Sequence, residues 1–207
     1  MLVAIDGPAG AGKSTVARGV ARELGFTYLD SGAMYRCVAL LSLADPASEP
    51  AALAAAARIE LSAARVLLDG EDVTERIRSP EVSRAASRVA ADPGVRAAMV
   101  ARQRALMAGG DWVAEGRDIG TVVAPEADLK VFLTADEGER ARRRAAELSQ
   151  PQEAVLAEQR ARDRRDTERE HGPLRPADGA VTVDSTGLDA GQVIERISAL
   201  ARGVRGP

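Results

Sequence analysis

Short apolar runs alternate along the chain with stretches in which apolar residues are spaced as on a helix. The runs predict buried strands at residues 2–5, 27–29, 112–114, 129–134 and 180–183. Between the first two runs, helical spacing predicts a helix over residues 14–24 that Gly25 ends. Asp189 and Gln192 have the spacing of a capping box and predict a last helix. This alternation predicts an α/β fold with a mostly parallel five-stranded sheet flanked by helices.

Two stretches depart from the alternation. A Pro- and Ala-rich section within residues 44–90 is followed by an apolar run at 65–68 and an Asp-Gly pair at 69–70, which predict a small hairpin in an insertion beside the core. Residues 138–170 form an almost wholly polar helical stretch with a break near 149–151. Because it cannot be a core helix, we interpret it as a solvated face or a mobile flap.

Composition narrows the chemistry. The 207 residues are 45% hydrophobic and 29% charged, which is typical of a globular protein with a real core. Cys37 and His171 are the single cysteine and histidine, which excludes an internal disulfide, a thiolate metal cluster and most zinc and triad chemistry. A net charge of −3 and five aromatic residues argue against nucleic acid as a partner.

No apolar run approaches the ~20 residues that span a bilayer, so we expect no membrane partner. The N-terminus has neither a basic flank nor a small-residue cleavage site, so it is not a signal peptide. We therefore expect a cytoplasmic protein.

A phosphate-binding loop follows the first predicted strand. The sequence Gly-Pro-Ala-Gly-Ala-Gly-Lys-Ser at residues 7–14 matches the G-x-x-x-x-G-K-[ST] pattern between a strand and a helix. Its backbone N–H groups and the helix N-terminus favour phosphate, Lys13 reaches the terminal phosphates, and the Ser14 hydroxyl is a ligand for Mg²⁺. The predicted ATP-binding residues are Gly7, Pro8, Ala9, Gly10, Ala11, Gly12, Lys13, Ser14 and Thr15.

The phosphate loop alone does not distinguish kinases from GTPases or motor ATPases. Lys13 and Lys130 are the only lysines, and neither lies in the Asn-Lys-x-Asp motif with which GTPases recognise the base. A kinase for a charged small acceptor needs a second cationic pocket, for which the planar fork of arginine is suited. Segments 30–36, 115–120 and 162–169 supply such arginines. Taken singly, each is also typical of packing, a surface ion pair or a solvated helix face.

Taken together, four segments resemble bacterial cytidylate kinases. They read Ile-Asp-Gly-Pro-Ala-Gly-Ala-Gly-Lys-Ser at 5–14, Leu-Asp-Ser-Gly-Ala-Met-Tyr-Arg at 29–36, Gly-Arg-Asp-Ile-Gly-Thr at 116–121 and Arg-Asp-Arg-Arg-Asp at 162–166. The resemblance runs in order to residues 181–186 and covers nearly the whole chain. It implies Mg²⁺-assisted transfer of the ATP γ-phosphoryl group to CMP or dCMP.

The resemblance also implies a division of the chain and roles for its residues. The implied parts are a P-loop NTPase core of residues 1–36 and 96–207, a monophosphate-binding insertion at 37–95 and a helical lid at 138–165. The implied CMP-binding residues are Ser87, Arg96 and Asp118 for cytosine, Arg162 and Asp166 for ribose, Arg36, Arg117 and Arg169 for phosphate, together with Ser31 and Tyr35. The implied catalytic residues are Lys13, Arg117 and Arg165, with Arg140 and Arg144 as further lid-side arginines. Glu115 stands where the family commonly has Asp and is a second candidate Mg²⁺ ligand.

Two other functions stay open at this stage. One is another nucleoside monophosphate kinase, acting on UMP or AMP, against which the trio Ser87, Arg96 and Asp118 argues. The other is a non-catalytic ATP-dependent nucleic-acid or regulatory module, which only the arginine clusters support. We expect a monomer that binds ATP and CMP or dCMP.

Overall fold

The computed structural model describes residues 1–62 and 64–206. The chain divides into two compact units. The first unit comprises Met1–Tyr28 and Gly110–Pro207, and the second unit comprises Leu29–Gly109.

A parallel sheet forms the centre of the first unit. Its strands are β1 (Leu2–Asp6), β6 (Trp112–Gly116), β7 (Leu129–Thr134) and β8 (Val181–Asp184), and β2 (Thr27–Asp30) completes the order β2-β6-β1-β7-β8. β1 pairs in parallel with β6 and β7, and β7 pairs in parallel with β8. The predicted five-stranded, mostly parallel sheet is therefore confirmed. The register places Asp6 opposite Gly116, so the ends of β1 and β6 meet at one edge.

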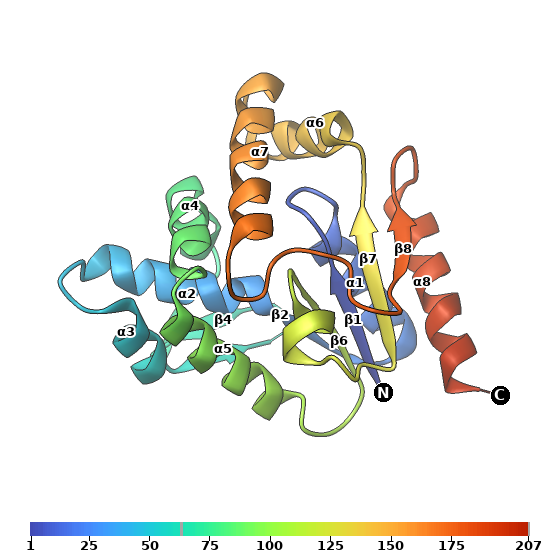
Figure 1. Cartoon of the computed structure of the whole chain (residues 1–207), viewed down its shortest axis with the longest axis horizontal. Coiled ribbons are helices and arrows are strands. Elements are labelled where there is room, and N and C mark those ends of the chain that lie inside the picture. Colours follow the sequence, from blue (N-terminus) through green and yellow to red (C-terminus); the bar gives the residue numbers. More distant parts are fainter. Residues whose placement is uncertain (63, 207) are drawn as a thin grey trace. The chain divides into compact units, whose positions relative to one another are not determined.

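Helices α1 (Lys13–Leu24) and α8 (Ala190–Arg205) pack together beside this sheet (Figure 1). Their buried side chains, Val16, Val20, Val193 and Ile197, join the strand residues in one hydrophobic core. The predicted cap of the last helix is present, because Asp189 accepts a hydrogen bond from the Gln192 N–H and the Gln192 side chain accepts one in return. Burial of this apolar face stabilises both helices against the sheet.

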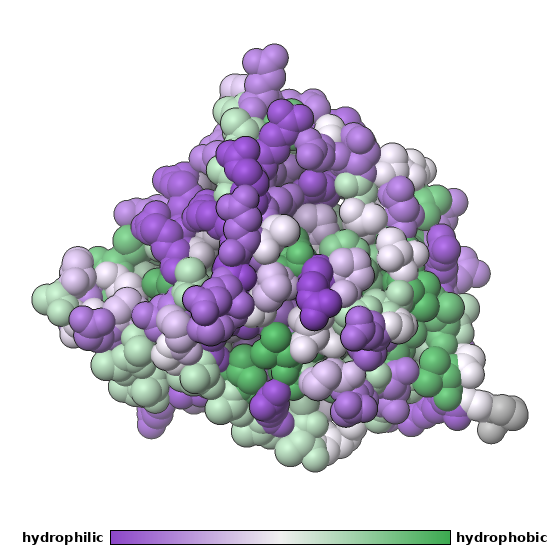
Figure 2. All heavy atoms as spheres, viewed as in Figure 1, coloured by the Kyte–Doolittle hydropathy of each residue, from purple (hydrophilic) through white to green (hydrophobic). Residues whose placement is uncertain are grey.

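The polar stretch after β7 folds as α6 (Glu137–Leu148) and α7 (Gln152–Glu168), which contact each other (Figure 1). The predicted break is present, since α6 ends at Ser149 in a left-handed conformation and α7 follows Pro151. Figure 2 shows hydrophilic residues gathered over these two helices. Not all of the stretch is solvated, however, because its buried residues are Arg140, Ala141, Ala145, Val155, Gln159 and Asp166. The stretch therefore combines a solvated face with a few buried side chains.

The second unit contains helices and a small antiparallel sheet. In chain order its elements are α2 (Ser31–Ala44), α3 (Pro50–Ala56), β3 (Ile59–Leu61), β4 (Val66–Leu68), β5 (Glu71–Asp72), a 3₁₀ turn (Arg76–Arg78), α4 (Pro80–Val89) and α5 (Pro93–Leu106). The predicted hairpin is β4 and β5, whose turn has Asp69 and Gly70 at φ 51° and 89°. A third strand, β3, pairs with β4 and was not expected from the sequence.

The bounds of the units differ from the boundaries expected at 36/37 and 95/96. α2 and α5 are continuous helices that cross those positions, and both belong wholly to the second unit. The compact second unit begins at Leu29, within β2, and ends at Gly109, after α5.

Candidate functional site

The phosphate loop connects β1 to α1 and requires glycine at specific positions. Gly10 and Gly12 have φ values of 75° and 86°, in the left-handed region that side chains disfavour. At Gly7 a Cβ atom would collide with the backbone carbonyl of Leu133 in β7. α1 begins at Lys13, directly after Gly12, so its N-terminal N–H groups face the loop as the motif predicts.

Lys13 folds back onto its own loop. Its Nζ atom donates to the Pro8 carbonyl oxygen over 2.8 Å. Burial, assisted by the positive charges of Arg117 and Arg162, lowers the pKa of Lys13 to about 7, although Glu115 and Asp6 oppose the shift. A cation whose charge costs free energy in this way gains most when an anion binds beside it.

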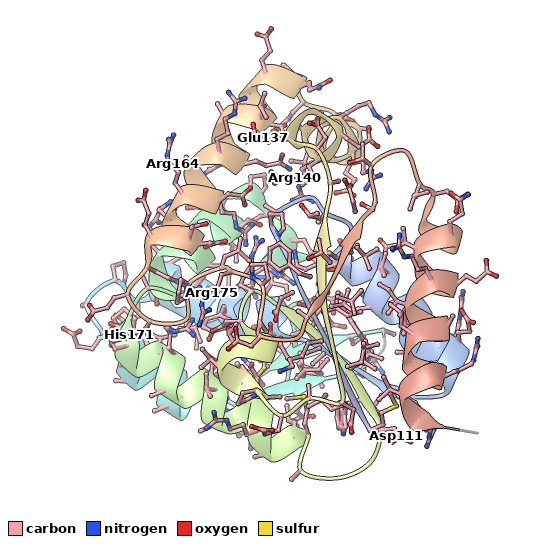
Figure 3. The ribbon with its side chains drawn as sticks, turned by 45° about the vertical axis from the view of Figure 1, so that its right-hand side comes forward. Asp111, Glu137, Arg140, Arg164, His171 and Arg175 are labelled. Atoms are coloured by element: carbon pink, nitrogen blue, oxygen red, sulfur yellow. The ribbon has the colours of Figure 1, made fainter. Side chains whose placement is uncertain are left out.

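Side chains from α6 and α7 contact the loop. Asp163 Oδ1 accepts from the Ala9 N–H over 3.1 Å, and Arg140 Nη1 donates to the Ala9 carbonyl over 2.8 Å and to Asp163 Oδ2 over 2.6 Å. Gln159 Nε2 donates to the Arg140 carbonyl and lies where a Cβ on Gly10 would be. Arg140, pointing inward in Figure 3, thus joins the predicted lid to the phosphate loop.

A buried carboxylate and an exposed hydroxyl are the candidate oxygen donors for a metal ion. Glu115 is the penultimate residue of β6, is buried, and accepts from the Tyr28 hydroxyl over 2.5 Å. Ser14 lies exposed in the first turn of α1. Hydroxyl and carboxylate oxygens are the ligands that Mg²⁺ prefers, so Ser14 and Glu115 fit the metal that accompanies ATP.

Arg117 connects the phosphate loop to α7. Its Nη1 atom donates to the Gly7 carbonyl over 2.6 Å, and its Nε atom lies 3.2 Å from Asp166 Oδ2. Asp166 is buried and also lies 3.9 Å from Arg162 Nε. A second ion pair, between Arg169 Nη2 and Asp118 Oδ1, spans 3.6 Å. The structure therefore brings together these five predicted residues of the first unit, Arg117, Asp118, Arg162, Asp166 and Arg169.

The second unit contains the other predicted acceptor residues. Arg36 Nη2 donates to Asp30 Oδ2 over 2.9 Å, and Asp30 Oδ1 caps α2 by accepting from the Ala33 N–H. The remaining members, Ser31, Tyr35, Ser87 and Arg96, are buried polar or aromatic side chains of α2, α4 and α5. The Ser87 hydroxyl has no hydrogen-bond partner within the described part of the protein. A buried hydroxyl without a partner costs free energy and is ready to bind a ligand.

Three predicted residues lie at the surface or bond within their own helix. Arg165 is exposed and its Nε atom donates to the Ala161 carbonyl of its own helix. Arg144 pairs with Glu147 over 2.8 Å on the outer part of α6. Thr15 is exposed beside Ser14. A catalytic role for Arg165 stays a prediction.

The sequence reasoning did not single out Asp6, Gln159 and Asp163 as site residues. Asp6 is 4% exposed and accepts from the N–H groups of Ile119 and Gly120 over 2.8 and 2.7 Å. Burial raises the pKa of Asp6 to about 6, although both N–H groups oppose the shift. A signal for Asp6 exists in the sequence, since it is a charged residue that ends an apolar strand directly before the loop.

Across residues 1–62 and 64–206, no group of three or more His, Cys, Asp or Glu side chains could hold a metal ion. Within the same ranges, no helix has the length and apolar character needed to cross a bilayer.

In sequence, the chain is similar to known proteins over nearly its whole length. The family model described as Cytidylate kinase matches residues 3–203. A cytidylate kinase of Solibacter usitatus is 49% identical, and the match covers 98% of this chain and 92% of that protein. A cytidylate kinase of Pelotomaculum thermopropionicum is 51% identical, with 95% and 94% covered.

Solved structures show the same architecture at low identity. A gluconokinase of Sinorhizobium meliloti superposes with a TM-score of 0.51 and 17% identity, covering 98% of this chain and 93% of that one. An uncharacterised protein of Eubacterium ventriosum gives 0.55 at 11% identity, with 97% of both chains covered. The fold is thus the α/β fold predicted from the sequence, with a mostly parallel five-stranded sheet flanked by helices.

Proposed function

Because the chain belongs to the cytidylate kinase family, we propose that it transfers the γ-phosphoryl group of ATP to CMP and dCMP. The products are ADP and the corresponding diphosphate. We also propose that Mg²⁺ accompanies ATP, that the enzyme acts as a monomer, and that it works in the cytoplasm, where ATP is made and used.

The position of Arg117 is the observation that carries this proposal. One guanidinium contacts the Gly7 carbonyl of the phosphate loop and the Asp166 carboxylate of α7 at the same time. The phosphate loop is expected to bind the reacting phosphates, and Asp166 is expected to bind the acceptor ribose. A planar fork held in this place is suited to phosphate oxygens, which it binds in a bidentate way.

Selectivity for cytosine is assigned to groups that complement its edge. The Asp118 carboxylate can accept from the exocyclic amine, whereas the Arg96 guanidinium and the Ser87 hydroxyl can donate to ring acceptors. The unpartnered Ser87 Oγ supports this role, because a ligand acceptor would satisfy it. Uracil presents an acceptor where cytosine has the amine, and a carboxylate disfavours it there.

Catalysis in this proposal rests on alignment and charge. Phosphoryl transfer needs little covalent participation by the protein, and cations around the transferring group stabilise the charge that spreads over its oxygens. Lys13 and Arg117 are held on the loop itself, and Arg140 contacts the loop from α6. Mg²⁺ held through Ser14 and Glu115 would neutralise further phosphate charge. Cover by α6 and α7 excludes water, which competes as acceptor.

An acceptor panel tests the function. ADP release is measured with CMP, dCMP, UMP, AMP and GMP at equal concentrations, and kcat/KM is compared. We expect CMP or dCMP to be the best acceptor by at least roughly tenfold, the discrimination that polar pockets achieve easily. A higher value for UMP or AMP would contradict the proposal. Tight binding of single-stranded RNA without CMP turnover would instead support the regulatory module.

A further inference from the structure

A buried carboxylate outside the predicted site holds the segment that carries Arg117 and Asp118. Asp6 ends β1 and is 4% exposed, and each of its oxygens accepts one backbone N–H, from Ile119 and from Gly120. Burial of a charge is costly unless hydrogen bonds satisfy it. These two bonds, between residues 113 and 114 positions apart, compensate part of that cost.

The two donors open the turn Ile119–Val123, whose first N–H groups have no partner within the turn. Asp118 occupies the N-cap position of that turn, where an Asp side chain ordinarily accepts from these N–H groups. Here the Asp118 side chain makes no such bond. Its carboxylate faces Arg169 instead, at 3.6 Å. The cap is therefore supplied by Asp6 from another strand.

The same end of β1 is bound to Arg117. The Gly7 carbonyl, next to Asp6, accepts from Arg117 Nη1 over 2.6 Å. Residues 6 and 7 thus hold residues 117–120 through three hydrogen bonds. Because the phosphate loop begins at Gly7, the loop and the segment that follows β6 are fixed to one another.

We propose that Asp6 is a positioning residue for acceptor recognition: by capping the Ile119–Val123 turn, it leaves the Asp118 carboxylate directed at the acceptor base. The inference rests on the proposed CMP kinase function. Asp6 itself contacts neither substrate. Its removal lets Asp118 turn back to cap its own turn, which withdraws the carboxylate that distinguishes the cytosine amine from the uracil oxygen.

The test is Asp6→Asn, which keeps the shape but offers one acceptor oxygen and one NH₂ donor to two N–H groups. We expect KM for CMP to rise about tenfold and the ratio of kcat/KM for CMP over UMP to fall about tenfold, while KM for ATP stays within twofold. Both readouts are independent of the fraction of folded enzyme, so partial loss of folding does not obscure them. Asp6→Ser, with a hydroxyl acceptor, is the second variant.

Asp111→Asn is the matched control. Asp111 is also a carboxylate next to β6, but it pairs with the N-terminal amine and Arg205 at the end of the first unit away from Arg140 (Figure 3). We expect it to lower Tm without changing KM for CMP or the CMP-to-UMP ratio. In Asp118→Ala, Asp6→Asn should add no further loss of the ratio.

The outcomes separate the two proposals. If the unmodified protein does not phosphorylate CMP, the function itself is wrong. If it does, and Asp6→Asn leaves both the CMP-to-UMP ratio and KM for CMP unchanged, Asp6 has only a structural role. An equal change in Asp111→Asn would also overturn the inference.

Discussion

The ammonium group of Lys13 lies where burial and Arg117 both oppose its charge, and its pKa falls to about 7. The polyphosphate of ATP reverses this balance, because an anion within a few ångströms raises the pKa of the lysine again. At pH 8 the free protein therefore has a mostly neutral Lys13, and ATP binding takes up close to one proton. At pH 6 Lys13 is already charged, and the uptake falls toward zero. Calorimetric titration of the protein with ATP, in two buffers of different ionisation enthalpy, measures the number of protons taken up.

Lys13→Arg is the control for this proton uptake. Arginine keeps a cation beside the phosphates but stays charged at both pH values, so its variant should show no uptake assigned to residue 13. Protons that ATP itself exchanges are the same in both proteins and cancel in the difference. Equal proton uptake in the two proteins at pH 8 would contradict the lowered pKa of Lys13.

Asp118 should determine acceptor use far more than donor binding. Its carboxylate is buried, faces Arg169, and lies after β6 rather than within the phosphate loop. Asp118→Ala leaves Arg169 and the cytosine amine without an anion, so we expect kcat/KM for CMP to fall roughly 10- to 100-fold. The dissociation constant of ATP, measured by equilibrium titration, should change by less than about twofold. A parallel loss of ATP affinity would show that Asp118 acts at the phosphate loop.

At the scale of elements, α6 and α7 share two ion pairs of different character. Arg140–Asp163 joins them with side chains 8% and 19% exposed, whereas Arg160–Glu137 joins them with side chains 57% and 53% exposed. Asp163 also accepts from the Ala9 N–H, so Asp163→Asn leaves a buried guanidinium and a loop N–H poorly satisfied. We expect it to lower the free energy of unfolding by about 2 kcal/mol in urea denaturation.

Glu137→Gln is the matched change on the exposed pair. Surface ion pairs contribute little because water screens them, so we expect a loss below about 1 kcal/mol. Hydrogen exchange should also separate the two variants, with faster exchange at residues 7–12 only in Asp163→Asn. If both variants lose the same stability and exchange alike, the Arg140–Asp163 pair does not hold the lid helices on the loop.

Elements that depend on local pattern were predictable from the sequence. The apolar runs located the five strands of the large sheet to within a few residues, because burial of a strand is visible in its own composition. β3 was missed because Ile59–Leu61 has three residues, of which the middle one is Glu60. Such a strand is too short for a periodic signal. The buried side of α6 and α7 was missed because Arg140 and Gln159 are polar and are buried by partners elsewhere in the chain.

The site was predictable in part for the same reason. The phosphate loop has a fixed pattern, so its residues follow from spacing alone. The arginine segments 30–36 and 115–120 come at the ends of strands that share one edge, whereas segment 162–169 lies at the C-terminal end of α7. The bonds of Asp6 to Ile119 and of Asp163 to Ala9 join residues 113 and 154 positions apart. No local pattern encodes such pairs, because the backbone N–H group that each carboxylate binds lies far away along the chain.

For the molecule as a whole, the scarcity of histidine, cysteine and lysine agrees with phosphoryl transfer. That reaction needs cations and alignment rather than a thiol or an imidazole. The 28 − 2 = 26 arginines divide into two groups. Some hold partly or fully buried carboxylates or carbonyls, as Arg117 and Arg140 do, whereas others, such as Arg142 and Arg160, form exposed pairs.

The surface of the described residues predicts a monomer. Within that part of the chain the exposed large hydrophobic residues are Leu106 and Val204, at 41% and 50%. A stable homodimer ordinarily buries a large apolar patch, and two isolated side chains do not make one. We expect light scattering after gel filtration to give a mass of 21.7 kDa. The value should stay constant over a hundredfold dilution and after addition of ATP or CMP. A dimer mass that dissociates on dilution would contradict this, and Val204→Asp would then test whether the end of α8 forms the interface.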